Sequence, residues 1–253
     1  MKSAKILVFK ISGEYAHFRK FNTTSSPLTY PIPTPPALAG LLGAILGIER
    51  EITPGKFNEG IVPVNEVFGN NKASFAIQIV KPLKKVNIGF NLLDTDKSAS
   101  SFFNITNRTQ IEFEMLKDAI FRIFLIHRED STFKELEARI VDKKHHFTPY
   151  LGISQCTANV EYEATINAHK IENQAGDFVS IISAIKLGQL NEEKPINFDQ
   201  NTSYATETMP IVMTKDRIVE EYSEVIMEQN GKSINANIQS YWSIPDFGNI
   251  SFL

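Results

Sequence analysis

Two short segments of this chain carry side chains that can bind or cleave RNA. The segment "VDKKHHFTPYLG" over residues 141–152 places Lys144, His145 and His146 together at the end of an expected helix. Two imidazoles and an amine can cleave RNA by general acid–base catalysis, with the 2′-hydroxyl as nucleophile and no metal ion. Cations at a helix C-terminus are also favoured by the helix dipole. We therefore prefer a structural or RNA-contacting role for these residues and keep catalysis as the alternative.

The second segment, "GEYAHFRKF" over residues 13–21, mixes aromatic and basic side chains. Single-stranded nucleic acid is bound by such mixtures, because bases stack on rings while cations contact phosphates. The candidate contacts are Tyr15, His17, Phe18, Arg19 and Lys20. The alternative is a structural loop in which the rings close the edge of the core and the two cations face solvent.

A proline-rich stretch, "LTYPIPTPPALAGLLGAIL" over residues 28–46, follows this loop. Its prolines keep the chain extended up to a helix that we expect from about Pro35 to Glu49. Gly40 and Gly43 each cost this helix roughly 1 kcal/mol relative to alanine. Their presence predicts a close approach to the helix, either tight packing, which we prefer, or a phosphate chain at its N-terminus.

The overall composition is that of an ordinary globular protein, with 42% hydrophobic and 22% charged residues in 253. The longest apolar run, residues 37–48, is too short to span a membrane, and no signal peptide is expected. The single cysteine, Cys156, fits a reducing cytoplasm and excludes a cysteine-rich zinc site. We therefore expect a cytoplasmic protein with no membrane contact, no metal and no cofactor.

Charge is distributed unevenly along the chain, although the net charge is only −3. Residues 1–20 hold five basic residues against one acidic residue, and residues 81–110 hold five against two. Residues 191–228 hold nine acidic residues against three basic ones. This pattern predicts one basic face, formed by the first two segments and residues 143–146, with the acidic segment elsewhere.

The hydrophobic pattern predicts an α+β fold. A central strand at residues 4–12, a loop at 13–36 and the glycine-containing helix come first. Strands on either side of Pro82, a hairpin of residues 110–117 and 119–128, and a helix from about residue 131 to 144 follow. The remainder reads as strands, with a type I′ hairpin turn at Asn230-Gly231. This order fits a ferredoxin-like sheet with helices on one face and a smaller antiparallel β region after it.

Two segments resemble a known family. "FKISGEYAHFRKFNTTSSPLTYPIPTPPALAGLLGAILG" (residues 9–47) is similar to the N-terminus of CRISPR-associated protein 5, a subunit of type I (Cascade) complexes, especially of the type I-B branch. "HHFTPYLGISQCTA" (residues 145–158) is similar to a segment in the middle of that family's chain.

The resemblance implies a RAMP-type ferredoxin-like domain over residues 1–170, with a projecting β-hairpin near residues 84–117, and a β-rich region over residues 171–253. It implies a subunit that caps the 5′ handle of the CRISPR RNA and contacts the backbone and large subunits of Cascade. The RNA contacts expected on this basis are Tyr15, His17, Phe18, Arg19, Lys20, Tyr30, Lys97, Phe102, Phe103, Arg108, Lys144 and His145.

Three functions remain open from the sequence. We prefer a non-catalytic RNA-binding subunit, for which no catalytic residue is expected. The second is a metal-independent endoribonuclease that processes precursor CRISPR RNA, with Lys144, His145 and His146 as its candidates, since one branch of the family cleaves with tyrosine, lysine and histidine. The third is a small-molecule binding domain, which needs a deep apolar pocket.

Overall fold

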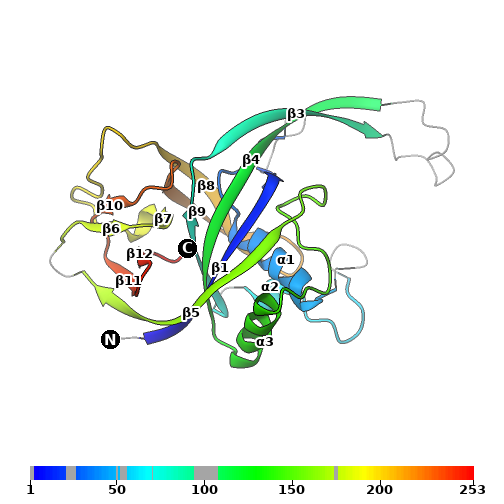
Figure 1. Cartoon of the computed structure of the whole chain (residues 1–253), viewed down its shortest axis with the longest axis horizontal. Helices are drawn as coiled ribbons and strands as arrows, with labels where there is room; N and C mark the ends of the chain where they lie inside the picture. The colour runs from blue at the N-terminus through cyan, green and yellow to red at the C-terminus, as the bar shows by residue number, and fades with distance from the viewer. Residues whose placement is uncertain are drawn as a thin grey trace.

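The computed structural model describes residues 3–20, 27–49, 51, 56–69, 71–93, 108–173 and 176–253. Its elements, shown in Figure 1, are in chain order β1 (Ser3–Ala16), α1 (Pro35–Leu46), α2 (Val64–Val67), β2 (Ala73–Ile79), β3 (Lys84–Leu93), β4 (Arg108–His127), α3 (Asp130–Val141), β5 (Asn159–Glu172), β6 (Val179–Ile181), β7 (Ile185–Lys186), the short 3₁₀ helix η2 (Leu187–Gln189), β8 (Tyr204–Met213), β9 (Val219–Glu228), β10 (Ile234–Ala236), β11 (Ser240–Ile244) and β12 (Gly248–Ile250). The protein is mostly β, with one curled sheet and a second small sheet, so the expected α+β class holds only in part.

β1 is the central strand of the large sheet, as the sequence predicts. Its neighbours are β4, where Leu7 pairs with Leu125, and β5, where Ile6 pairs with Ile166, both antiparallel. Ile6, Leu7 and Val8 are completely buried, because β1 is covered on both faces. With β2 on the far side of β4, the four strands lie in the order β5-β1-β4-β2.

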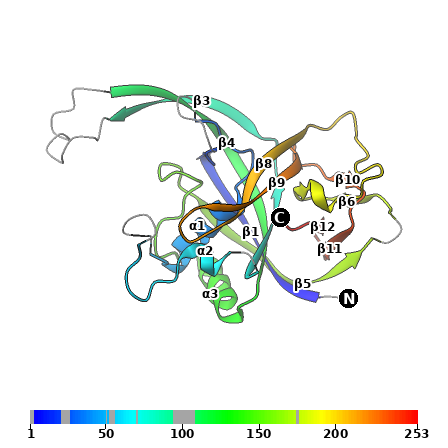
Figure 2. The same ribbon diagram turned by 180° about the vertical axis from the view of Figure 1, so that it is seen from behind.

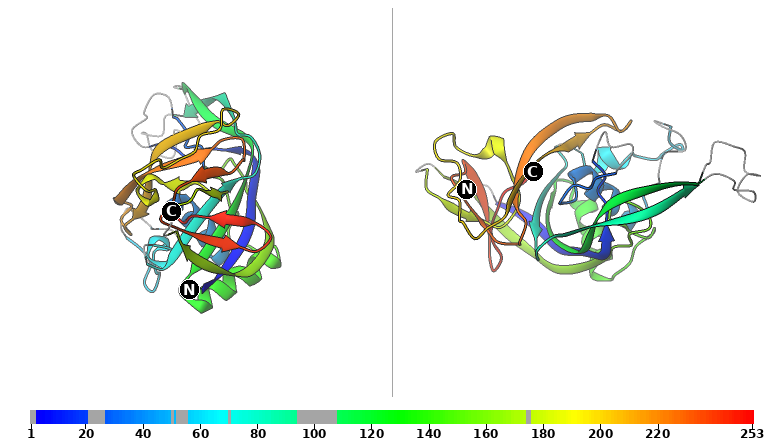
Figure 3. Two further views of the ribbon diagram at one scale, coloured as in Figure 1. Left: turned by 90° about the vertical axis from the view of Figure 1, so that its left-hand side faces the viewer. Right: turned by 90° about the horizontal axis from the view of Figure 1, so that it is seen from above.

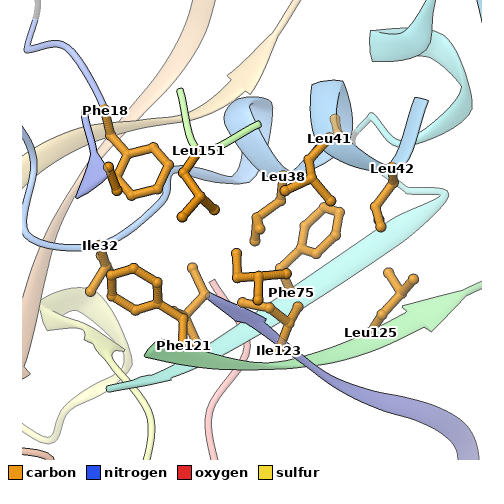
Figure 4. Close-up of a cluster of buried hydrophobic side chains, with 14 of the residues drawn as sticks. Phe18, Ile32, Leu38, Leu41, Leu42, Phe75, Phe121, Ile123, Leu125 and Leu151 are labelled. Atoms are coloured by element: carbon orange, nitrogen blue, oxygen red, sulfur yellow. The ribbon is translucent and has the colours of Figure 1, made fainter. Parts of the chain in front are cut away.

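The two faces of this sheet have different covers. On one face, α1 and α3 pack over the sheet through apolar side chains, part of which Figure 4 shows: Leu38, Leu41 and Leu42 from α1 above Phe75, Ile123 and Leu125 from β2 and β4. On the other face, Val8 and Phe124 meet Ile244 and Ile250 from the C-terminal strands. Both faces are thus buried under parts of the same chain.

β3 and the first half of β4 form an arm that extends away from the rest of the molecule (Figures 1 and 3). The two strands pair from Lys84 and Lys117 to Leu93 and Arg108. The predicted turn at residue 118 is wrong. Asp118 has a left-handed backbone (φ 51°), yet the strand continues through it. One half of β4 pairs with β3 and the other half with β2, which makes a single long strand more favourable than a hairpin.

The C-terminal region continues the large sheet. The expected domain boundary between residues 170 and 171 falls inside β5, which pairs with β1 and, near its end, with β11. β8 and β9 form a hairpin that joins β7 in the small sheet and lies across α1 (Figure 2).

The predicted hairpin around Asn230-Gly231 is wrong, although the chain does turn there, with a φ of 83° at Gly231. β9 pairs with β8 and β7, whereas β10 pairs with β6 in the other sheet. The buried Glu228 carboxylate stabilises the turn, since it accepts hydrogen bonds from the backbone N–H groups of Asn230 (2.9 Å) and Lys232 (2.6 Å). In the part of the chain that the structure describes, no helix has the length and apolar character of a membrane span.

Candidate nucleic-acid interface

The N-terminus of α1 begins at Pro35, as predicted, but offers no backbone donor to a phosphate in its first turn. Pro35 and Pro36 have no N–H group. The N–H of Ala37 donates to the Thr34 hydroxyl (3.3 Å), and the N–H of Leu38 donates to the Thr34 carbonyl (3.0 Å). The interpretation of this stretch as a phosphate cradle is therefore wrong.

The glycines of α1 favour the packing interpretation instead. A Cβ atom added to Gly43 would lie 2.6 Å from a methyl group of Val64, and one added to Gly47 would lie 2.7 Å from the His146 ring. Gly47 also ends the helix with a left-handed backbone (φ 84°). Gly40 differs, because a Cβ atom there would meet nothing within 4 Å, so this part of α1 faces open space.

The aromatic residues of the 13–21 segment lie mostly inside the protein. β1 extends four residues further than expected and places Tyr15 opposite Lys117 of β4. His17 and Phe18 are buried, and the Phe18 ring meets Phe121 edge-on at 6.0 Å. Tyr30 is buried as well, and its backbone N–H donates to the Phe18 carbonyl (2.7 Å). His17, Phe18 and Tyr30 thus close the edge of the core, which is the structural alternative considered for this segment.

His17 is a neutral core residue. Burial lowers its pKa, and the hydrogen bond between Nδ1 and the Glu114 carbonyl (2.8 Å) opposes this only in part. Its Nε2 atom is buried without a hydrogen-bond partner among the described residues. The ring lies 5.2 Å from Phe113. These contacts hold the backbone at His17 in place, directly before Arg19 and Lys20.

Arg19 and Lys20 remain at the surface and line a groove of about 790 Å³. We call it the α1 groove. One wall comes from residues 17–20, Tyr30 and α1, and the other from the β8–β9 hairpin; the lining residues used below are Arg19, Lys20, Tyr30, Gly40, Gly152, Arg217 and Tyr222. The Lys20 ammonium lies 5.7 Å from the centre of the Tyr30 ring and 2.6 Å and 2.7 Å from the two Glu207 oxygens. The groove therefore combines cations, the exposed ring of Tyr222 and an open helix face.

The predicted single basic face does not form. Lys20 pairs with Glu207, which belongs to the acidic segment 191–228 that we expected elsewhere. Lys5 pairs with Glu137 of α3 (3.3 Å), and Lys85 pairs with Glu114 (3.1 Å). Lys5, Lys10 and Lys20 of the N-terminal segment, and Lys85 of the 81–110 segment, are thus matched by acids from neighbouring elements.

Lys144, His145 and His146 lie at the other end of α1 from Arg19. The backbone N–H groups of His146 and Phe147 donate to the Ile45 and Ala44 carbonyls (3.2 and 2.9 Å), which completes the C-terminus of α1. The His145 side chain lines a small cavity of about 110 Å³ together with Lys143 and Lys144. The His146 ring instead packs against Phe147 at 4.6 Å. The two imidazoles therefore have different surroundings.

The remaining predicted residues belong to the arm. Arg108 is exposed at the outer end of the β3–β4 pairing. Lys97, Phe102 and Phe103 lie outside the described residues.

Two residues of the α1 groove, Arg217 and Tyr222, were missed by the sequence analysis. Both belong to the segment 191–228, which we did not consider for RNA binding because its net charge is acidic. The basic pair Lys215 and Arg217 around the hairpin tip was the available signal.

A family model described as "CRISPR-associated protein (Cas_Cas5)" matches residues 6–194, more than half of the chain. The chain belongs to this CRISPR-associated Cas5 family.

Solved structures are similar to the chain at low sequence identity. A chain of a structure titled "CRISPR RNA-guided surveillance complex" aligns with a TM-score of 0.48 and 12% identity, covering 90% of this chain and 91% of that chain. A chain of "Cryo-EM structure of the Type III-B Cmr-beta bound to cognate target RNA and AMPPnP, state 1" aligns with a TM-score of 0.49 and 13% identity, covering 91% and 86%. A chain of a third structure, titled "Crystal structure of Cas protein", aligns with a TM-score of 0.43 and 14% identity, covering 90% of this chain and 95% of that chain. No curated protein matches the chain.

Proposed function

We propose that this protein is the RNA-binding subunit of a type I CRISPR surveillance complex (Cascade), that it binds the 5′ handle of the CRISPR RNA, and that it contacts the backbone and large subunits. The observation that carries the proposal is the family match over residues 6–194. The α1 groove supports it, because Arg19 and Lys20 can neutralise phosphates beside the small residues of α1. A small-molecule binder is less well supported, since this groove is open and carries three basic side chains.

The proposal includes a ferredoxin-like assignment for the central sheet. The order β5-β1-β4-β2 is antiparallel throughout, with α1 between β1 and β2 and α3 between β4 and β5. This is the order of a split β-α-β-β-α-β unit, into which β3 is inserted. The inserted β3 and its β4 partner form the arm that we assign to subunit or RNA contacts.

The experiment that tests the proposal is purification of the tagged protein together with its genomic neighbours, followed by sequencing of the bound RNA. We expect a stable complex that contains RNAs with one common repeat-derived 5′ end. Recovery of the protein without RNA, or with unselected cellular RNA, would contradict the assignment.

Cleavage of precursor RNA by Lys144, His145 and His146 is the alternative activity. Two contacts favour a packing role for these residues over catalysis: the His146 ring lies against Gly47 and Phe147, and the Lys144 ammonium pairs with Asp142 (2.9 Å). We expect the variant His145→Ala/His146→Ala to leave precursor processing in cells unchanged. The purified wild-type protein should not cleave repeat RNA in the presence of a chelator. Chelator-resistant cleavage that disappears in the double variant would establish the nuclease instead.

A further inference from the structure

The β8–β9 hairpin faces Arg19 and Lys20 across the α1 groove and carries two side chains suited to RNA. Tyr222 lines the groove with 46% of its surface exposed, which is high for a tyrosine in a paired strand. Arg217 lines the same groove from the turn that follows β8. An exposed ring and a guanidinium are the groups that single-stranded RNA uses for stacking and for phosphate contact.

The hairpin is held in place beside α1 by polar contacts at three points. The Asn65 amide donates to the Thr214 carbonyl (2.8 Å), Arg217 Nε donates to the Glu51 carboxylate (2.9 Å), and Glu207 of β8 pairs with Lys20. These contacts fix the second wall of the groove relative to the first without help from a partner. A ligand between the walls would therefore meet a preformed site, and little ordering free energy would be lost on binding.

The guanidinium of Arg217 can serve Glu51 and a phosphate at once. The ion pair engages Nε, while the two terminal nitrogens of an arginine carry four further N–H donors. The arginine side chain is 51% exposed, so these nitrogens can be reached from solvent. On the opposite wall, the open space above Gly40 leaves room for a ribose–phosphate chain.

We infer that the β8–β9 hairpin forms the second half of the RNA site, with Tyr222 stacking on a base and Arg217 donating to a phosphate of single-stranded RNA in the α1 groove. The inference rests on the proposed function, and it deepens that function by adding a region outside the segments from which RNA contacts were predicted. Stacking is tolerant of base identity, so Tyr222 adds affinity rather than sequence selectivity.

The test measures the affinity of the purified protein for a fluorescently labelled single-stranded RNA that carries the repeat-derived handle. We expect Tyr222→Ala to weaken binding by about 5- to 150-fold, the range for loss of one stacked base, and Tyr222→Phe to bind like the wild type. We expect Arg217→Ala to weaken binding by about tenfold or more and to reduce the slope of log affinity against log salt by about 0.7.

A matched control separates RNA contact from a purely structural role of Arg217. Glu51→Gln removes the same ion pair but keeps the guanidinium, and we expect it to bind RNA at least as well as the wild type. Phe198→Ala removes an exposed ring that does not line the groove and should also bind normally. A loss with Glu51→Gln equal to that with Arg217→Ala, or wild-type binding by both Arg217→Ala and Tyr222→Ala, would overturn the inference while the proposed function stands. Absence of RNA binding by the wild type would instead remove the proposed function.

Discussion

Replacing Gly152 with alanine is expected to destabilise the folded protein by about 3 kcal/mol or more. Gly152 has a left-handed backbone (φ 89°), and an added Cβ atom would lie 1.9 Å from the His17 carbonyl oxygen. That oxygen is a backbone atom in the segment that forms one wall of the α1 groove, so it cannot move aside cheaply. The left-handed backbone alone costs an alanine roughly 1–2 kcal/mol. Urea unfolding followed by circular dichroism measures the change.

Gly40→Ala is the matched control, because Gly40 lines the same groove but has free space around its Cα atom. Alanine there removes the entropic cost of a glycine inside a helix, so we expect a gain of about 0.5–1 kcal/mol. Equal effects of the two substitutions would contradict the packing that places residue 152 against His17.

The second large effect concerns RNA affinity. We expect Arg19→Ala combined with Lys20→Ala to weaken handle binding by one to several orders of magnitude, because each charge-assisted phosphate contact contributes about 1.5–3 kcal/mol. The slope of log affinity against log salt should fall by about 1.4, the share of two phosphate contacts on a single strand. Arg19 is exposed, but the Lys20 and Glu207 side chains are only 23% and 22% exposed, so the Glu207 carboxylate left unpaired should cost about 1–2 kcal/mol of folding stability.

Fluorescence anisotropy at several salt concentrations and thermal unfolding of the same samples measure both quantities. Lys134→Ala is the control, since it removes a lysine of α3 that is also ion-paired, to Asp130, and lies outside the groove. If the double variant binds RNA as tightly as the control, Arg19 and Lys20 have a structural role only. If the double variant unfolds at a temperature well below that of the control, a weaker RNA affinity would reflect lost folding and would not show that Arg19 and Lys20 contact the RNA.

The parts of the fold that were predicted correctly are those governed by local chemistry. The apolar run in β1 indicated a strand buried on both faces, and the prolines marked the start of α1 at Pro35. The strand over residues 84–93 was predicted from its regular pattern, whereas the projecting hairpin near residues 84–117 was implied by the family resemblance. In these places a side chain's own preference and its tertiary surroundings agree.

The errors arose where distant pairing decided the structure. A polar residue such as Asp118 normally indicates a turn, yet β4 continues because β2 and β3 each pair with a different half of it. Asn230-Gly231 turns the chain between two sheets rather than within a hairpin, since β9 and β10 find partners elsewhere. The pairings of β2 with β4 and of β6 with β10 join strands that are far apart in the sequence, so a local residue pattern cannot predict them.

The site was predicted in part, for a similar reason. Arg19 and Lys20 were identified from their segment, but the burial of His17 and Phe18 depends on contacts with β4, about a hundred residues away. Arg217 and Tyr222 were hidden by the acidic charge of their neighbours in the sequence. Only the folded hairpin brings them to a basic groove.

The central position of β1 has a consequence for synthesis in the cell. β1 is made first, but its partners Leu125 in β4 and Ile166 in β5 are more than a hundred residues further along the chain. At a translation rate of about 5–20 residues per second, β1 waits roughly 6–24 s before its partner Leu125 is synthesised. During that time the apolar side chains of β1 have no partner strands in the nascent chain, and the sheet can form only late in synthesis. Recombinant yield should therefore depend strongly on chaperone supply and on growth temperature.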